Sequence, residues 1–294
     1  MDELLDLIRS KSKLSDVGRE LLLYDSMWAD TAQARLAAGG APVIAPVFIT
    51  GTGRTASSFF HAAMRDVGFR VATVQEATTL VSAEDADDIL VRAVDTYIRM
   101  GDEEAPEYAM INPHQWDDPA EDIHFDRSAW LPGWWLPHYG GTFEWSTVRM
   151  FADPSQQYQH LRRCAEVLSV GGERWCFRSP VHLLHLPALY AEFPDAIVVW
   201  LERDSEQVEP GLRKMIYSMR RTRSREVDED EVAMLANSQA TLSPMIAQAA
   251  VDSGAVPLDQ LIRVQFEDIT ENVDVTVSNV MQRVSDVTLR FDPQ

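Results

Sequence analysis

The chain has 294 residues, of which 26 are basic and 46 acidic, so its formal net charge at pH 7 is −20. Nucleic acids and anionic membranes select basic surfaces, so this charge argues against both as partners. The composition, 46% hydrophobic and 24% charged, is that of a globular protein with enough apolar material for a large core. Two cysteines cannot form a disulfide framework, which favours the reducing cytoplasm. No apolar run approaches about 18 residues, so no membrane span is expected.

The pattern of apolar residues predicts strands that alternate with helices. Residues 1–39 have helical spacing with a break at Ser15 and Asp16, and residues 47–50 are β-branched and apolar, as in a buried parallel strand. Strands are also expected at 69–74, 175–177, 196–201 and 262–266, and helices at 56–66, 158–168, 181–193, 206–217, 229–250 and 273–284. This alternation predicts the α/β class, with a central parallel sheet flanked by helices.

The chain has no clean linker, so residues 1–294 are expected to form a single domain. Residues 112–150 are rich in aromatic side chains and have a loop-like composition, which predicts an insertion or lid within that domain. The sequence does not decide whether the protein forms a homo-oligomer.

A glycine turn joins the first strand to the following helix, in the order in which anion sites are built. A nucleoside-triphosphate loop is disfavoured, because its lysine and second glycine are not in place. Gly51, Gly53 and Ala56 fit a dinucleotide fingerprint, and Glu76 stands where a ribose-binding acid belongs. Alternatively, Arg54 faces a transferred group while hydroxyls and backbone amides at the helix start bind a phosphate. An ordinary turn with a surface arginine is the third interpretation.

Two later segments distinguish these alternatives. One runs Trp175-Cys176-Phe177-Arg178-Ser179-Pro180-Val181-His182-Leu183, and the other begins Phe193-Pro194-Asp195-Ala196 and ends its strand in Glu202-Arg203-Asp204. Together with the glycine turn and Val264-Gln265-Phe266-Glu267-Asp268-Ile269, they resemble the sulfotransferase family, in particular its bacterial branch and the tyrosylprotein sulfotransferases. The resemblance covers nearly the whole chain in the right order.

The resemblance implies a P-loop-containing, sulfotransferase-like nucleotide-binding fold. It also implies transfer of a sulfuryl group from 3′-phosphoadenosine 5′-phosphosulfate to a hydroxyl of a small, apolar acceptor, without a metal. Arg54 and Arg178 then contact the sulfuryl region, and Arg203 binds the 3′-phosphate. The implied nucleotide-binding residues are Gly51, Gly53, Arg54, Thr55, Ala56, Ser57, Ser58, Arg203 and Gly211.

Several positions depart from the family pattern. Ala56 replaces a loop glycine, Arg178 replaces a lysine, and Phe266 replaces a frequent tyrosine. Gly211 stands where the family usually has a serine, which predicts the loss of a hydrogen bond worth about 1.5–3 kcal/mol to a charged group. Two alternatives therefore stay open: a Rossmann-type NAD(P)-dependent oxidoreductase, and a non-catalytic sulfotransferase-like protein that binds a nucleotide.

The catalytic base and the acceptor contacts are less clearly marked. Glu76 is the first candidate for the base, because it lies near the end of the strand expected at 69–74, where ligands of α/β proteins bind. His182 is a rival, from the helical turn after Arg178. The predicted acceptor contacts are Trp130, Trp134, Trp135 and His114, with core packing as the alternative for the tryptophans.

A basic run of six residues within 13 positions lies not far after Arg203, in and after the helix expected at 206–217. It either flanks the nucleotide as a local positive funnel or forms a solvated helix face next to acidic residues 228–231. Its members are Arg213, Lys214, Arg220, Arg221, Arg223 and Arg225.

Overall fold

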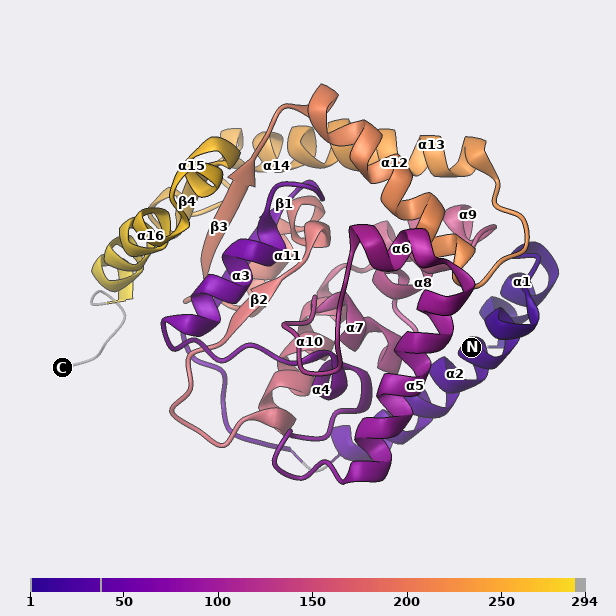
Figure 1. Cartoon of the computed structure of the whole chain (residues 1–294). Coiled ribbons are helices and arrows are strands. Elements are labelled where there is room, and N and C mark those ends of the chain that lie inside the picture. Colours follow the sequence, from indigo (N-terminus) through magenta and orange to yellow (C-terminus); the bar gives the residue numbers. More distant parts are fainter. Residues whose placement is uncertain (1, 38, 289–294) are drawn as a thin grey trace.

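The computed structural model describes residues 2–37 and 39–288 (Figure 1). Its centre is a four-stranded parallel sheet in the order β2-β1-β3-β4. The strands are β1 (Val47–Gly51), β2 (Cys176–Arg178), β3 (Ile197–Glu202) and β4 (Leu261–Gln265). In the register, Phe48 of β1 pairs with Phe177 on one side and Val198 on the other. The predicted α/β class with a central parallel sheet is confirmed.

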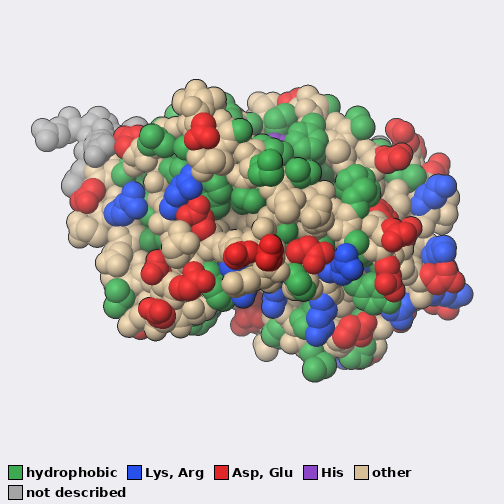
Figure 2. Space-filling view, turned by 90° about the horizontal axis from the view of Figure 1, so that it is seen from above, with side chains coloured by type: hydrophobic (Ala, Val, Ile, Leu, Met, Phe, Trp, Pro, Cys, Tyr) green, Lys and Arg blue, Asp and Glu red, His purple; other side chains and the backbone are tan. Residues whose placement is uncertain are grey.

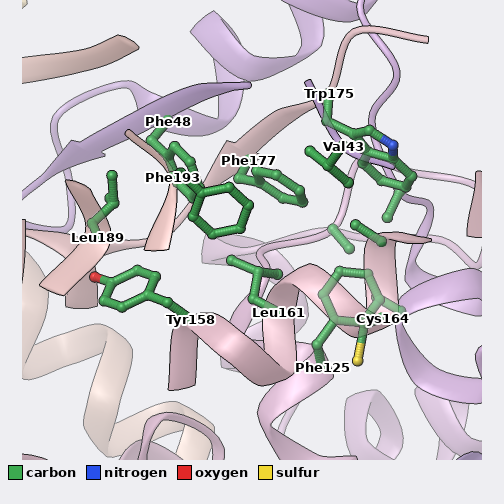
Figure 3. Close-up of a cluster of buried hydrophobic side chains, with 14 of the residues drawn as sticks. Val43, Phe48, Phe125, Tyr158, Leu161, Cys164, Trp175, Phe177, Leu189 and Phe193 are labelled. Carbon is green, nitrogen blue, oxygen red and sulfur yellow. The ribbon is translucent and has the colours of Figure 1, made fainter. Parts of the chain in front are cut away.

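Both faces of the sheet are covered by apolar side chains, which explains why β1 and β3 lack charged residues before their ends. One face carries an aromatic cluster in which Phe48, Phe177 and Phe193 meet side chains of helix α10 (Ser155–Leu168), as Figure 3 shows. The other face packs against α3 (Ser57–Asp66) and α16 (Val273–Thr288). Burial therefore fixes β1, and with it the turn that follows.

The N-terminal helices α1 (Asp2–Lys11) and α2 (Asp16–Leu36) lie at the edge of the molecule away from α16 (Figure 1). Ser15 begins α2 by accepting a hydrogen bond from the Gly18 amide. Leu4 and Ile8 of α1 share an apolar cluster with Trp135 of α8 (Pro132–His138).

The remaining elements are mostly short helices. They are α4 (Val74–Thr79), α5 (Asp88–Glu104), α6 (Pro106–Ile111), α7 (Ile123–Asp126), η1 (Arg127–Ala129), α9 (Phe143–Ala152), η2 (Pro180–Leu184), α11 (Leu186–Glu192), α12 (Ser205–Arg221), α13 (Glu229–Asn237), the π-helix η3 (Ser238–Leu242), α14 (Ser243–Asp252), η4 (Leu258–Gln260) and α15 (Phe266–Glu271). None of the described helices is both long and apolar enough to cross a membrane.

Three predicted elements are corrected. Residues 69–74 do not form a strand: Arg70 makes one isolated parallel bridge to Trp175, and Thr73 then caps α4. The segment 112–150 is largely helical rather than loop-like, because several of its aromatic side chains, among them Trp134, Trp135 and Tyr139, are buried. The helix expected at 181–193 is divided into η2 and α11, where His185 has a non-helical backbone.

Candidate active site

The glycine turn after β1 has the backbone of an anion-binding loop. A Cβ at Gly51 would lie 2.5 Å from the Leu201 carbonyl oxygen, so only glycine lets β1 end this close to β3. Arg54 and Ala56 then adopt left-handed backbone angles, with φ of 69° and 61°. Ala56 precedes α3 without any side-chain cap. The first backbone amides of α3 are therefore not capped by a side chain. Amides at a helix start or in a concave turn of this kind can bind an anion.

Two arginines flank this turn. The Arg203 guanidinium donates a hydrogen bond from Nη1 to the Arg54 carbonyl oxygen over 2.8 Å, and it lies 3.8 Å from the ring centre of Phe266. The side chain of Arg54 lies across Gly211, where an added Cβ would come within 3.2 Å of Arg54 Cγ. Two departures from the family pattern thus gain a physical reason, since Phe266 supports Arg203 and Gly211 makes room for Arg54.

Arg178 connects three parts of the site. Its Nη1 donates to Ser58 Oγ over 2.7 Å and to Glu121 Oε1 over 2.8 Å, while Ser57 Oγ lies at 3.5 Å. Arg178 is 7% exposed, and its Nε has no partner among the described residues. The end of β2, the start of α3 and the segment before α7 therefore meet at one guanidinium group.

Glu121 is a site residue that the sequence did not indicate. It lies 57 positions before Arg178 in a segment that carried no recognised motif. The only signal is that two acids, Glu121 and Asp122, follow Pro119 next to the aromatic region. The side chain of Glu121 is 30% exposed, so it is accessible while it pairs with Arg178.

His182 is buried behind Arg178 rather than exposed to a ligand. Its Nε2 donates to Asp122 Oδ2 over 2.7 Å, and its Nδ1 accepts a hydrogen bond from the Tyr158 hydroxyl over 3.3 Å. Burial, with the carboxylate of Asp122 as a further cause, raises the pKa of Tyr158 well above its ordinary value, so the phenol stays a donor. The Asp122 amide donates to the Arg178 carbonyl oxygen over 3.1 Å. His182 therefore positions the segment that carries Glu121.

Glu76 is 2% exposed and has its carboxylate fully engaged. Arg70 donates to both of its oxygens, over 2.7 and 3.0 Å, and the amides of Thr73 and Ala83 donate over 2.9 and 3.0 Å. Burial acts to raise the pKa of Glu76, but the ion pair with Arg70 and the amide hydrogen bonds outweigh it and hold the pKa below its ordinary value. These bonds order residues 70–83 and are not directed to Arg54 or Arg178.

Two cavities of different character meet at Glu121. The apolar cavity has a volume of about 190 Å³ and is lined mainly by aliphatic and aromatic side chains of α8, α9, η2 and α12, with Thr52 and Glu121 near the glycine turn. The polar cavity has a volume of about 360 Å³, and its lining includes Asp102, Tyr108, Arg178 and Arg223. Both cavities are lined by Glu121, Ile123, Met215 and Met219.

The predicted acceptor contacts are divided between a cavity and the core. His114 and Trp134 line the polar cavity. Trp130 and Trp135 stack on each other and pack against the N-terminal helices, so the cavities give no support to their predicted contact with an acceptor. Among the described residues, no group of three or more His, Cys, Asp or Glu is arranged to hold a metal ion.

The parallel sheet, the strained turn after β1 and the arginines around it define an α/β protein with a positively charged turn at the end of its first strand. The model of the sulfotransferase family matches residues 46–285, so the chain belongs to that family. This membership confirms the resemblance seen in the sequence and sets aside the dinucleotide-binding alternative.

Two solved structures from mycobacteria have the same fold. Sulfotransferase STF9 from Mycobacterium avium superposes with a TM-score of 0.71 at 19% identity, covering 96% of this chain and 76% of that one. Sulfotransferase STF1 from Mycobacterium tuberculosis superposes with a TM-score of 0.68 at 17% identity, covering 96% of this chain and 80% of that one. The search of curated proteins returns no significant match.

Proposed function

We propose that this protein transfers a sulfuryl group from 3′-phosphoadenosine 5′-phosphosulfate to a hydroxyl of a small, apolar acceptor. The observation that carries the proposal is the junction of Arg178 with Ser58 and Glu121. A cation, the start of the anion-binding helix and an accessible carboxylate meet there, beside an apolar cavity. The two cysteines are free and buried, which suits work in the reducing cytoplasm.

The donor is held by the glycine turn in this proposal. The amides of residues 55–58 and the hydroxyls of Ser57 and Ser58 bind its 5′-phosphate, and Arg203 binds its 3′-phosphate. Thr55 Oγ1 and Arg178 Nε are buried donors without a partner among the described residues, so an anion at the turn would satisfy groups that are otherwise unpaired.

Glu121 acts as the base in this proposal, in place of Glu76. Arg178 bonds Oε1 of Glu121, which leaves Oε2 to accept the proton of the acceptor hydroxyl. The hydroxyl oxygen forms a bond to sulfur while the bond from sulfur to the bridging phosphate oxygen breaks, and its electron pair leaves with the nucleotide. Arg54 and Arg178 offset the charge that develops on the transferred group.

A comparison of ligands tests the donor. 3′-Phosphoadenosine 5′-phosphate should raise the melting temperature, whereas NAD should not. Arg203→Ala should abolish the shift, and Arg213→Ala, which removes an exposed arginine that pairs with Glu209 on α12, should preserve it. Transfer of labelled sulfate to an acceptor panel then tests turnover. Stabilisation by NAD alone would overturn the proposal, and donor binding without transfer to any acceptor would favour the non-catalytic alternative.

A further inference from the structure

One face of the protein exposes apolar side chains beside a stretch of the chain that carries no charged residue. Residues 232–251 contain no Asp, Glu, Lys or Arg, although charged residues make up 24% of the chain. This stretch covers residues 232–237 of α13, the whole π-helix η3, and all of α14 except its last residue, Asp252. Leu242 and Met245 are 50% and 65% exposed there, and Val148 and Phe151 of α9 are 69% and 55% exposed. We call these four residues the apolar rim.

Hydrophobic side chains gather in the upper middle of the face seen in Figure 2, which is the side of the molecule that carries α12, α13 and α14 in Figure 1. Acidic side chains lie in a band below them in the same view. Contiguous exposed apolar surface of this kind marks binding sites in soluble proteins. A cationic or anionic partner finds no matching charge on the uncharged stretch, so an apolar ligand is the occupant that fits it.

The apolar rim is continuous with the apolar cavity. Phe151 and Leu242 are both half exposed and both line that cavity, whereas Thr52 and Glu121 line it near the reacting groups. The cavity therefore extends from the transfer site to the surface. Ser238, Gln239 and Leu242 of η3 form part of its wall, and π-helical turns are frequent at functional sites because they locally widen a helix.

We propose that the acceptor is a single-chain amphiphile. Its hydroxylated head lies at Glu121, on the side of the polar cavity, and its alkyl chain fills the apolar cavity and leaves the protein at the apolar rim. This inference rests on the proposed function, since it assigns the acceptor of the same site. The two cavities share Glu121, and only the polar cavity also carries charged side chains such as Asp102, Arg178 and Arg223, which suits a molecule with one polar and one apolar end.

Chain length is the variable that tests this geometry. The affinities of n-alkyl β-D-glucosides with chains of 4 to 14 carbons, below their micelle concentrations, would be measured by calorimetry with and without 3′-phosphoadenosine 5′-phosphate. Affinity should rise roughly three- to four-fold per methylene while the chain fills the cavity. It should then level off, because further methylenes lie outside the rim. A fall in affinity for the longest chains would show a closed pocket, and no dependence on length would show no chain site; either result overturns the inference.

A pair of leucine variants localises the exit. Leu242→Glu at the rim should weaken binding of the longest chains at least ten-fold and leave the shortest unchanged. Leu258→Glu is the matched control, because Leu258 is 65% exposed on η4 and does not line the apolar cavity. Equal effects of both variants would overturn the rim as the exit, provided that both melt like the parent.

The outcome is separable from that of the proposed function, because glucoside binding requires neither donor nor turnover. Length-dependent binding without any sulfate transfer would sink only the proposed function. Transfer to short alcohols without a chain-length effect would sink only the inference.

Discussion

Glu121 and Glu76 are two carboxylates that each pair with an arginine, but their surroundings differ. Glu121 keeps an accessible side chain beside two cavities, whereas Glu76 is buried and receives hydrogen bonds from Arg70 and two backbone amides. A base must reach the proton that it accepts, so accessibility separates the two residues more clearly than their position in the sequence.

Glu121→Gln should reduce kcat by about 10²- to 10⁴-fold, because an amide cannot accept the acceptor proton. The melting-temperature shift caused by 3′-phosphoadenosine 5′-phosphate should persist, since Arg203 and the glycine turn are unchanged. The measurement is labelled-sulfate transfer under saturating donor. If Glu121→Gln retains full activity and a correctly folded Glu76→Gln loses it, the base is Glu76, as the sequence first suggested.

Glu76→Gln should instead lower the free energy of unfolding by about 2–3 kcal/mol at pH 7, because it breaks a charge-assisted pair with Arg70. The folded pKa of Glu76 is lowered, so its contribution to stability is present above the ordinary glutamate pKa and is lost as the pH falls through the folded value. The difference between parent and variant in urea melts should therefore shrink below about pH 4. A difference that is constant between pH 7 and pH 3 would contradict this assignment.

At the scale of elements, the basic run is divided: Arg213, Lys214 and Arg225 are exposed, whereas Arg220 at the end of α12 and Arg223 just after it form buried structural contacts. Arg223 is buried and lies near Asp25 of α2, and Arg220 is buried and pairs with Glu231. The Arg223 carbonyl oxygen accepts a hydrogen bond from the Ser15 amide. These contacts attach the N-terminal helices to the end of α12.

Gly18 makes this attachment close, because a Cβ there would overlap the Arg223 carbonyl group. Gly18→Ala should therefore destabilise the protein by about 1–3 kcal/mol, despite the better helix propensity of alanine. Gly101→Ala in α5 is the matched control: its Cβ would meet Thr222 Cβ at an ordinary 3.6 Å, so it should stabilise by about 0.5–1 kcal/mol. Chemical denaturation measures both, and a stabilising Gly18→Ala would refute the close approach.

The sequence predicted β1, β3 and β4 to within one or two residues, because short apolar runs with β-branched residues need no distant partner to be recognised. It missed α8, whose Pro132, Gly133 and Pro137 look like loop residues and become helical through burial of Trp134 and Trp135. The family resemblance predicted Arg54, Arg178 and Arg203 as site residues, and the fold brings all three to the glycine turn. The sequence did not indicate Glu121, because Glu121 joins the candidate site only through its contact with Arg178, 57 positions away, and spacing along the chain does not reveal such a contact.

At the scale of the whole molecule, the net charge of −20 opposes the approach of an anionic donor. Since Arg220 and Arg223 are buried and paired, the attraction comes from few groups, chiefly Arg54, which is exposed, and Arg203, which is partly exposed. Direct contacts act over hydrogen-bond distances, whereas repulsion from the many surface carboxylates acts over tens of ångströms. Salt therefore separates the two contributions.

Raising the ionic strength from 0.01 to 0.15 M shortens the screening length from about 30 Å to about 8 Å. This removes most of the long-range repulsion and leaves the contacts of Arg54 and Arg203 largely intact, so association of 3′-phosphoadenosine 5′-phosphate should accelerate by roughly two- to five-fold. Stopped-flow mixing in potassium chloride and in potassium acetate measures this rate and controls for competition by a specific anion. A rate that falls with salt in both would mean that the local positive field of the glycine turn outweighs the charge of the whole protein.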